Sequence, residues 1–186
     1  MQAEIDKALK TLKSGGIILY PTDTSWGIGC DATHATAVDR IFELKKRPGD
    51  KAMICLVNDF RMLSQYLNQV PEMAYDVLKY ANKPTTVVYD DPIRVAENLV
   101  AADNSLAIRV VRDTFCGELI KRLKKPLVST SANLSGAPTP AKFKDIDKAI
   151  VQGVDYVVNW NRDKVNKRSS SIIKIKNDGT VKVIRS

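Results

Sequence analysis

The sequence predicts an α/β or α+β fold in which helices cover a mixed β-sheet. Strand candidates rich in β-branched and apolar residues alternate with amphipathic helical stripes along most of the chain. This order is expected for a sheet covered by helices. The last two strand candidates flank an Asn177-Asp178-Gly179 turn. They are expected to form an antiparallel hairpin, so the sheet that contains them is expected to be mixed.

The N-terminal elements follow from the spacing of apolar residues. Four of them, spaced i, i+3, i+4 and i+7, predict a first helix that two glycines end: Ile5, Ala8, Leu9 and Leu12. A short strand is expected at 17–20. Residues 21–31 are expected to form a loop with hydroxyl and carboxyl side chains and two glycines. A second helix follows, with an apolar face formed by Val38, Ile41 and Phe42.

The rest of the chain continues the alternation of strands and helices. Strands are expected at 52–57, 85–89, 106–111, 127–130, 171–175 and 181–184. Helices are expected at 60–67, after Pro71, and around an apolar stripe of Cys116, Leu119, Ile120 and Leu123. Residues 159–170 are polar and basic, and we expect a surface loop there.

The composition is that of one soluble globular domain, which we expect to span residues 1–186. No apolar run approaches the ~18 residues of a membrane helix, and the N-terminus lacks the apolar core of a signal peptide. We therefore expect a cytoplasmic protein with no membrane partner. Cys30, Cys55 and Cys116 lie far apart and are expected to be buried reduced thiols. The single histidine, His34, argues against a zinc site.

Two segments are rich in neutral polar side chains next to predicted strands. Residues 20–29 combine hydroxyls with glycines that let the backbone approach a ligand, although a turn and capping segment has the same composition. Residues 125–136 place hydroxyl and amide side chains directly after an apolar strand. They either cap a helix or form an anion- or nucleotide-binding turn, and their density favours the turn.

Two further segments carry cations, and the net charge of +8 favours anionic partners. Residues 45–51 hold four Lys or Arg side chains at a helix end. There they either stabilise the helix dipole or bind a phosphate or carboxylate, and both interpretations stay open. Arg109 is the one charged residue of the apolar strand Ser105–Val110. It needs either a structural carboxylate or an anionic ligand, and we slightly favour the ligand.

These segments together resemble the YrdC/TsaC family of threonylcarbamoyl-AMP synthases. The resemblance runs in order through PTDTSWGIGCD, ELKKRPGDK, SLAIRV, KPLVSTSANLSG, SSSII and the terminal VIRS. Its most diagnostic combination is KxR, formed by Lys45 and Arg47, with STSAN at 129–133. The resemblance implies a twisted, largely open YrdC-like sheet with a basic concave face. We expect Lys45 and Arg47 to face the STSAN turn across one anion-holding hollow.

The resemblance also implies a reaction. A nucleotidyltransferase of this family joins L-threonine, bicarbonate and ATP into threonylcarbamoyl-AMP and releases pyrophosphate, for the N6-threonylcarbamoyladenosine (t6A) modification of tRNA. Mg²⁺ is expected to accompany the ATP, with no dedicated metal site in the chain. Expected partners are tRNA or another structured RNA, and the threonylcarbamoyl transferase machinery that uses the product.

Residue roles carry over by motif position. The residues implied to bind threonine are Thr24, Arg109, Ser129 and Ser170, and the serine run 169–171 leaves the last assignment ambiguous by one position. Those implied to bind ATP and bicarbonate are Lys45, Arg47, Lys51, Ser105, Ser131, Asn133, Thr139 and Arg185. The catalytic set is expected to be Lys45, Arg47, Ser131 and Asn133.

Two other functions remain alternatives. The net charge suggests an RNA-binding module, but aromatic residues make up only 6% of the chain and show no stacking pattern. A paralogue with altered carbamoyl or adenylyl transfer would keep the fold, and the intact KxR and STSAN motifs argue against it.

Overall fold

A nine-stranded mixed sheet, with helices packed on it, confirms the predicted fold class. The computed structural model describes residues 1–46, 53–165 and 169–186. In these residues the helices are α1 (Gln2–Lys13), α2 (Ala35–Leu44), α3 (Phe60–Gln65), α4 (Glu72–Tyr80), α5 (Thr114–Leu123) and α6 (Lys148–Gly153). The strands are β1 (Ile18–Pro21), β2 (Trp26–Gly29), β3 (Ile54–Val57), β4 (Thr85–Asp90), β5 (Ser105–Val110), β6 (Leu127–Ser131), β7 (Tyr156–Val157), β8 (Ser171–Ile175) and β9 (Val181–Arg185).

The strand order is β7-β1-β2-β6-β3-β5-β4-β8-β9, so strands from distant parts of the chain become neighbours. β3 pairs with β5 and β4 with β8 in parallel, whereas β6 is antiparallel to both β2 and β3. The terminal hairpin of β8 and β9 is antiparallel, as predicted. Because β6 lies between β2 and β3, the polar turn after β6 starts near the middle of the sheet.

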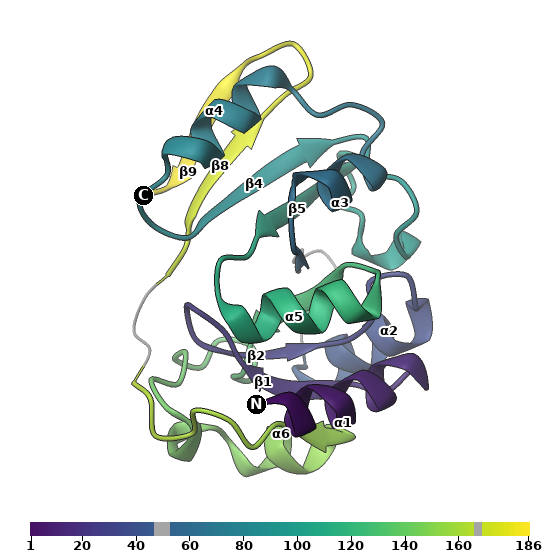
Figure 1. Ribbon diagram of the computed structural model, residues 1–186, viewed down its shortest axis with the longest axis vertical. Helices are drawn as coiled ribbons and strands as arrows, with labels where there is room; N and C mark the ends of the chain where they lie inside the picture. The colour runs from purple at the N-terminus through teal and green to yellow at the C-terminus, as the bar shows by residue number, and fades with distance from the viewer. Residues whose placement is uncertain (47–52, 166–168) are drawn as a thin grey trace.

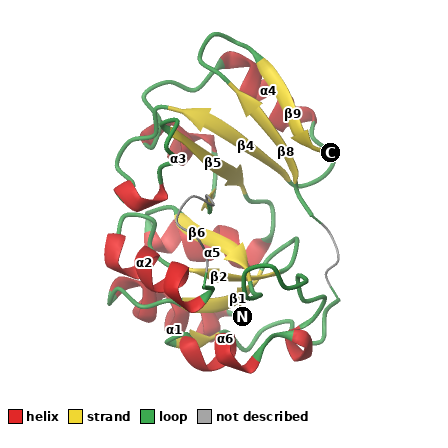
Figure 2. Cartoon of the chain, turned by 180° about the vertical axis from the view of Figure 1, so that it is seen from behind, coloured by secondary structure: helices red, strands yellow, loops and turns green. Residues whose placement is uncertain are grey.

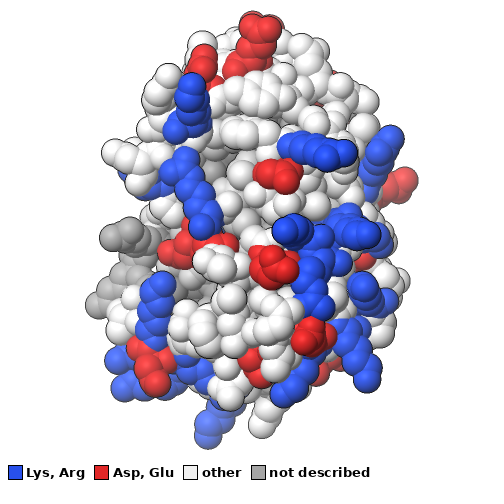
Figure 3. Space-filling view, viewed as in Figure 1, with Lys and Arg blue, Asp and Glu red and all other residues white. Residues whose placement is uncertain are grey.

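Helices cover the sheet in two groups (Figure 1). α1 packs on α5, and both lie over β1 and β2 on the face toward the viewer. α4 lies beside the β8 and β9 hairpin at the opposite end of the molecule. Seen from behind in Figure 2, α5 lies beyond the strands. Figure 3 shows many Lys and Arg side chains over the lower part of the Figure 1 face, where α1 and α5 lie.

The predicted helices form where their apolar stripes can be buried. All four apolar residues of the α1 stripe are buried. Asp113 caps α5 by accepting a hydrogen bond from the Cys116 backbone N–H at 2.9 Å, which satisfies a donor that the first helical turn leaves unpaired. The three cysteines are buried and free, as predicted, and burial raises the pKa of Cys55 to about 12.

The prediction of a continuous loop at 21–31 was wrong. Trp26–Gly29 is a fully buried strand that pairs with both β1 and β6. The two glycines suggested a loop, but close packing explains them better. A Cβ on Gly29 would lie 2.2 Å from the Val128 carbonyl oxygen and 2.8 Å from the Tyr20 ring, so only glycine fits there. Only 22–25 form the turn, closed by a hydrogen bond from Thr22 N–H to the Ser25 carbonyl at 3.1 Å.

Several short elements between β4 and β8 were not predicted. They are α6, β7, and the 3-10 turns Glu97–Leu99 and Phe143–Asp145, all too short to show an apolar period. In the part of the chain that the structure describes, no helix is both long and apolar enough to cross a membrane.

Candidate active site

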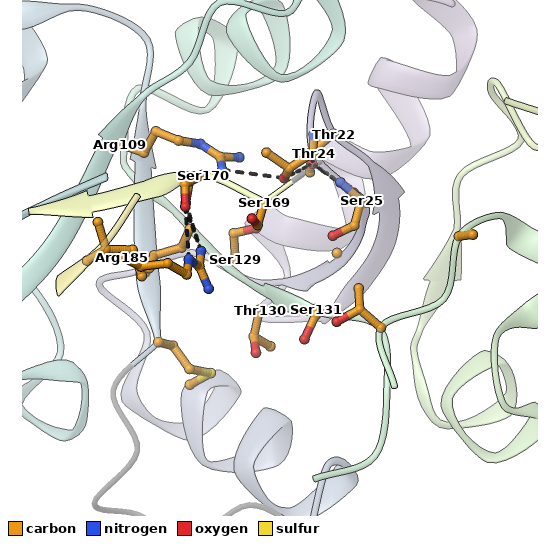
Figure 4. Close-up of a pocket in the computed structure, with 16 residues that line it drawn as sticks. Thr22, Thr24, Ser25, Arg109, Ser129, Thr130, Ser131, Ser169, Ser170 and Arg185 are labelled. Atoms are coloured by element: carbon orange, nitrogen blue, oxygen red, sulfur yellow. Dashed lines mark hydrogen bonds between the residues drawn. The ribbon is translucent and has the colours of Figure 1, made fainter. Parts of the chain in front are cut away.

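A cavity of about 550 Å³ opens where three of the four segments predicted to bind ligands come together: 20–29, 105–110 and 125–136 (Figure 4). It is lined from the β1–β2 turn, from β5, from β6 and from the two ends of the β8–β9 hairpin. The lining residues are Thr22, Thr24, Ser25, Gly27, Met53, Ile54, Arg109, Ser129, Thr130, Ser131, Thr139, Ala141, Ser169, Ser170, Ile172 and Arg185. Their hydroxyls and two guanidinium groups suit a polar, anionic ligand.

The four residues implied to bind threonine all line this cavity: Thr24, Arg109, Ser129 and Ser170. They come from four different segments of the chain. β2, β6, β3 and β5 are consecutive in the sheet, which brings the first three within reach of one ligand. The fourth arrives through the pairing of β8 with β4, the strand next to β5.

Arg109 has a structural carboxylate partner and also lines the cavity. Its Nη2 donates to Asp23 Oδ1 at 3.0 Å, and its Nη1 donates to Thr24 Oγ1 at 3.4 Å. The Arg109 side chain is 3% exposed and that of Asp23 is 19% exposed. The buried Nε has no hydrogen-bond partner. The guanidinium is therefore held against the β1–β2 turn while it faces a polar cavity.

The β1–β2 turn is itself stabilised by hydroxyl groups. Thr22 Oγ1 donates to the Ser25 carbonyl at 2.7 Å and accepts from the Thr24 N–H at 3.1 Å. Its hydroxyl lies 2.9 Å from Thr24 Oγ1. This network orients Thr24 toward Arg109. The sequence-based assignment missed Thr22 and Ser25, although their place in the PTDTSW motif was a usable signal.

The structure narrows the choice among the three serines at 169–171. Ser169 and Ser170 line the cavity, whereas Ser171 is the first residue of β8 and does not. The Ser170 hydroxyl accepts a hydrogen bond from Thr86 Oγ1 at 2.9 Å. Arg185 donates to the Ser170 carbonyl through Nε at 3.0 Å and through Nη2 at 2.8 Å. Thr86, a buried β4 residue that sequence reasoning missed, thus supports Ser170 from behind.

The residues implied to bind ATP and bicarbonate divide into four groups. Ser131, Thr139 and Arg185 line the cavity. Lys45 and Asn133 lie beside Ser131 but are not among the lining residues, and Arg47 and Lys51 lie outside the described residues. Ser105 is the first residue of β5, four positions before Arg109, and its hydroxyl donates to Asp103 Oδ1 at 2.5 Å.

The prediction that Lys45 faces the STSAN turn across an anion-holding hollow was wrong. Lys45 is in direct hydrogen-bond contact with that turn. Its ammonium donates to the main-chain carbonyls of Ser131 and Asn133, the latter at 2.6 Å. The residue is only 1% exposed. The Asn133 amide donates to the carbonyls of Leu134 at 3.0 Å and Ala137 at 2.6 Å.

A group of buried ionisable side chains lies behind Arg109. Burial raises the pKa of the Asp113 carboxyl, and the nearby charge of Asp23 raises it further. Burial also raises the pKa values of Cys116 and Tyr20. In the described residues there is no cluster of three or more His, Cys, Asp or Glu side chains that could hold a metal ion.

Comparison with known proteins decides the family. The family model named Sua5_yciO_yrdC, with the description "Telomere recombination", matches residues 10–186. The chain belongs to the Sua5/YciO/YrdC family. A threonylcarbamoyl-AMP synthase of Hahella chejuensis is 34% identical over 166 residues, which are 89% of this chain and 90% of that relative.

Solved structures of the Sua5/YciO/YrdC family share the fold. P. abyssi Sua5, solved in complex with L-threonine, superposes with a TM-score of 0.82 and 25% identity. The match covers 92% of this chain and 50% of that one, so the chain spans about half the length of Sua5. E. coli YciO superposes with a TM-score of 0.86 over 100% of this chain and 90% of its own, at 24% identity.

Proposed function

We propose that this chain is an L-threonylcarbamoyladenylate synthase, a nucleotidyltransferase that supplies t6A modification of tRNA. The observation that carries the proposal is the cavity, which gathers all four residues implied to bind threonine and three of those implied to bind ATP and bicarbonate. The synthase name of the curated relatives supports the same reaction and does not favour an RNA-binding module or an altered transferase.

The proposed chemistry proceeds in two steps. The neutral amine of threonine attacks bicarbonate and gives a carbamate and water. A carbamate oxygen then attacks the α-phosphorus of ATP, the bond to the β-phosphate oxygen breaks, and pyrophosphate leaves. Negative charge on the phosphate oxygens must be balanced throughout this transfer. Arg185, Ser131 and Thr139 line the cavity, and we propose that their guanidinium and hydroxyl groups orient the nucleotide.

The threonine end of the cavity is proposed to be the Arg109 side. A guanidinium can form two parallel hydrogen bonds with a carboxylate, and Arg109 lines the cavity next to the Thr24 and Ser129 hydroxyls. Ser170 would contribute a further hydroxyl, with Ser169 as the other lining serine. Arg47 and Lys51, which lie outside the described residues, are proposed on sequence alone to bind phosphate.

Mg²⁺ is proposed to enter bound to the phosphates of ATP. This metal usually keeps several waters and binds through substrate phosphates with few protein carboxylates. We further propose that residues 1–186 are a single YrdC-like domain, located in the cytoplasm. Its product would pass to a threonylcarbamoyl transferase that acts on tRNA.

The test is pyrophosphate release from ATP in the presence of threonine and labelled bicarbonate. We expect release that requires threonine, with one label retained in an AMP-linked product for each pyrophosphate formed. Omitting threonine is the matched control. Release that continues without threonine, or an AMP product that lacks the label, would contradict the proposal.

A further inference from the structure

Lys45 is a buried cation at the C-terminal end of α2. It is 1% exposed and is among the largest fully buried side chains of the described residues. An ammonium group removed from water needs strong hydrogen-bond partners, because desolvation of a charge is costly. The partners that a buried lysine has found therefore indicate what it does.

Lys45 is bonded to the main chain of the turn after β6 from two sides. Two of its three ammonium donors reach the carbonyl oxygens of Ser131 and Asn133. Its own carbonyl accepts a hydrogen bond from the Ser135 N–H at 2.9 Å. The end of α2 and residues 131–135 are thus held together by three hydrogen bonds. Bonds from a charged donor are stronger than neutral ones.

The strand β6, which leads into this turn, presents groups to the cavity. Ser129, Thr130 and Ser131 line it, whereas Lys45 does not. Because Lys45 holds the carbonyls of Ser131 and Asn133, it restrains the main-chain path directly after the lining strand.

We propose that Lys45 is a positioning residue, which holds the 131–135 turn so that Ser131 faces the nucleotide. This departs from the role of direct ATP and bicarbonate ligand that the KxR motif suggests. The inference rests on the proposed function for its kinetic consequence, but its structural consequence concerns the chain without substrates. A turn held by Lys45 must loosen when the ammonium is removed, even when no nucleotide is present.

The experiment is hydrogen–deuterium exchange of the ligand-free chain, compared between wild type and Lys45→Met. We expect exchange of the amides in 131–137 to rise at least about tenfold, since hydrogen bonds to a charged group are lost. Exchange in α1 should not change. Lys46→Met is the matched control, because it removes an equal charge one residue along from an exposed position, and it should exchange like wild type.

Kinetics separate a positioning role from a direct one. A distorted turn should lower kcat/KM for ATP and for threonine together, since Ser129 and Ser131 lie on the same strand. Wild-type exchange in 131–137 combined with a rise in KM for ATP alone would overturn the inference and make Lys45 a direct ligand.

Lys45→Arg provides the second variant if Lys45→Met does not fold. Arginine keeps the charge, but its planar donors cannot reproduce the bonds of a compact ammonium to two carbonyls in a buried space. We expect raised exchange in 131–137, and wild-type exchange with weakened ATP binding would overturn the inference. Should the wild-type chain itself release no threonine-dependent pyrophosphate, the proposed function fails, while the exchange comparison still tests the turn.

Discussion

Two buried cations, Lys45 and Arg109, occupy different regions and have different kinds of partner. Lys45 is 1% exposed and donates to main-chain carbonyls behind the cavity. Arg109 is 2% exposed, lines the cavity and donates to the side chains of Asp23 and Thr24. Bonds to the main chain hold a backbone in place, whereas bonds between side chains can be exchanged for bonds to a ligand.

This difference defines two regions. The region around Lys45 supports the main chain of the turn after β6, and the region around Arg109 is proposed to contact the substrate. Around Lys45, the ammonium and the Asn133 amide nitrogen donate to main-chain carbonyls of the turn, while the buried Asn133 Oδ1 has no hydrogen-bond partner. Around Arg109, the Nε remains without a partner, and the hydroxyls of Thr24 and Ser129 border the cavity. The second region therefore has its guanidinium and hydroxyl groups at the cavity, and substitutions in it should affect threonine most.

The largest effect is expected from Arg109→Met. Removing one partner of a buried charge pair leaves Asp23 uncompensated and removes the proposed carboxylate ligand, a change of about 2–5 kcal/mol. This predicts a fall in kcat/KM for threonine of roughly 30-fold to over 1,000-fold, measured by pyrophosphate release. Arg61→Met, on the exposed face of α3, is the control and should behave as wild type. Equal falls in kcat/KM for ATP and for threonine would contradict the assignment of the Arg109 region to threonine.

Asn133→Ala is expected to have the next largest effect. It removes two hydrogen bonds inside the turn that Lys45 also holds. A net loss of about 1 kcal/mol for each bond predicts a fall of about tenfold or more in kcat/KM for ATP. The circular-dichroism spectrum should stay that of a folded chain. An unfolded spectrum would show that Asn133 is needed for the fold itself.

Thr86→Val tests the support behind Ser170. The substitution keeps the shape of the buried side chain but removes the donor to Ser170 Oγ. Loss of one neutral hydrogen bond predicts a rise of about 3- to 10-fold in KM for threonine, with little change in kcat. Thr85→Val removes the neighbouring hydroxyl, which bonds to the Lys83 carbonyl, and serves as control. A similar rise in both variants would point to general loosening of β4.

Asp113→Asn should change how stability depends on pH. Burial raises the pKa of Asp113, so above the unfolded value the native state binds more protons than the unfolded state. Wild-type stability therefore falls as pH rises through the raised pKa. Asparagine does not titrate and keeps the oxygen that caps α5. The variant should gain stability relative to wild type as pH rises from 3.5 to 7, measured by thermal unfolding. A relative loss over this range would show that the Asp113 charge is compensated by Arg109.

Local sequence patterns predicted the elements whose apolar stripe extends over several helical turns, and those with a strong turn signal. The α1 stripe and the hairpin around Gly179 were found in this way, since burial of one helix face and the turn's backbone demands are local effects. The strand Trp26–Gly29 was missed because its glycines suggested a loop, whereas Gly29 is required by a neighbour 99 positions along the chain, the carbonyl of Val128.

The residues of the candidate site likewise divide into those that the sequence motifs predicted and those that they did not. The motifs identified Thr24, Arg109, Ser129 and Ser131 before any fold was known, because hydroxyls and cations outside apolar stripes stand out. The motifs implied an ATP ligand at Lys45 and a threonine ligand at Arg109, and they gave no sign that Lys45 would bond to main-chain carbonyls. They also left the serine run undecided, and they gave no signal for Thr86, which resembles any other threonine of a strand.

The amino-acid sequence alone determined the order of the main helices and strands, the family, and the set of polar and cationic residues available to a substrate. Only the tertiary structure decided which of these face the cavity. A side chain's direction depends on strands that are distant in the chain, such as β6 between β2 and β3. Lys45 and Arg109 carry the same charge, but folding brings them different partners. Lys45 bonds to main-chain carbonyls behind the cavity, whereas Arg109 lines the cavity itself.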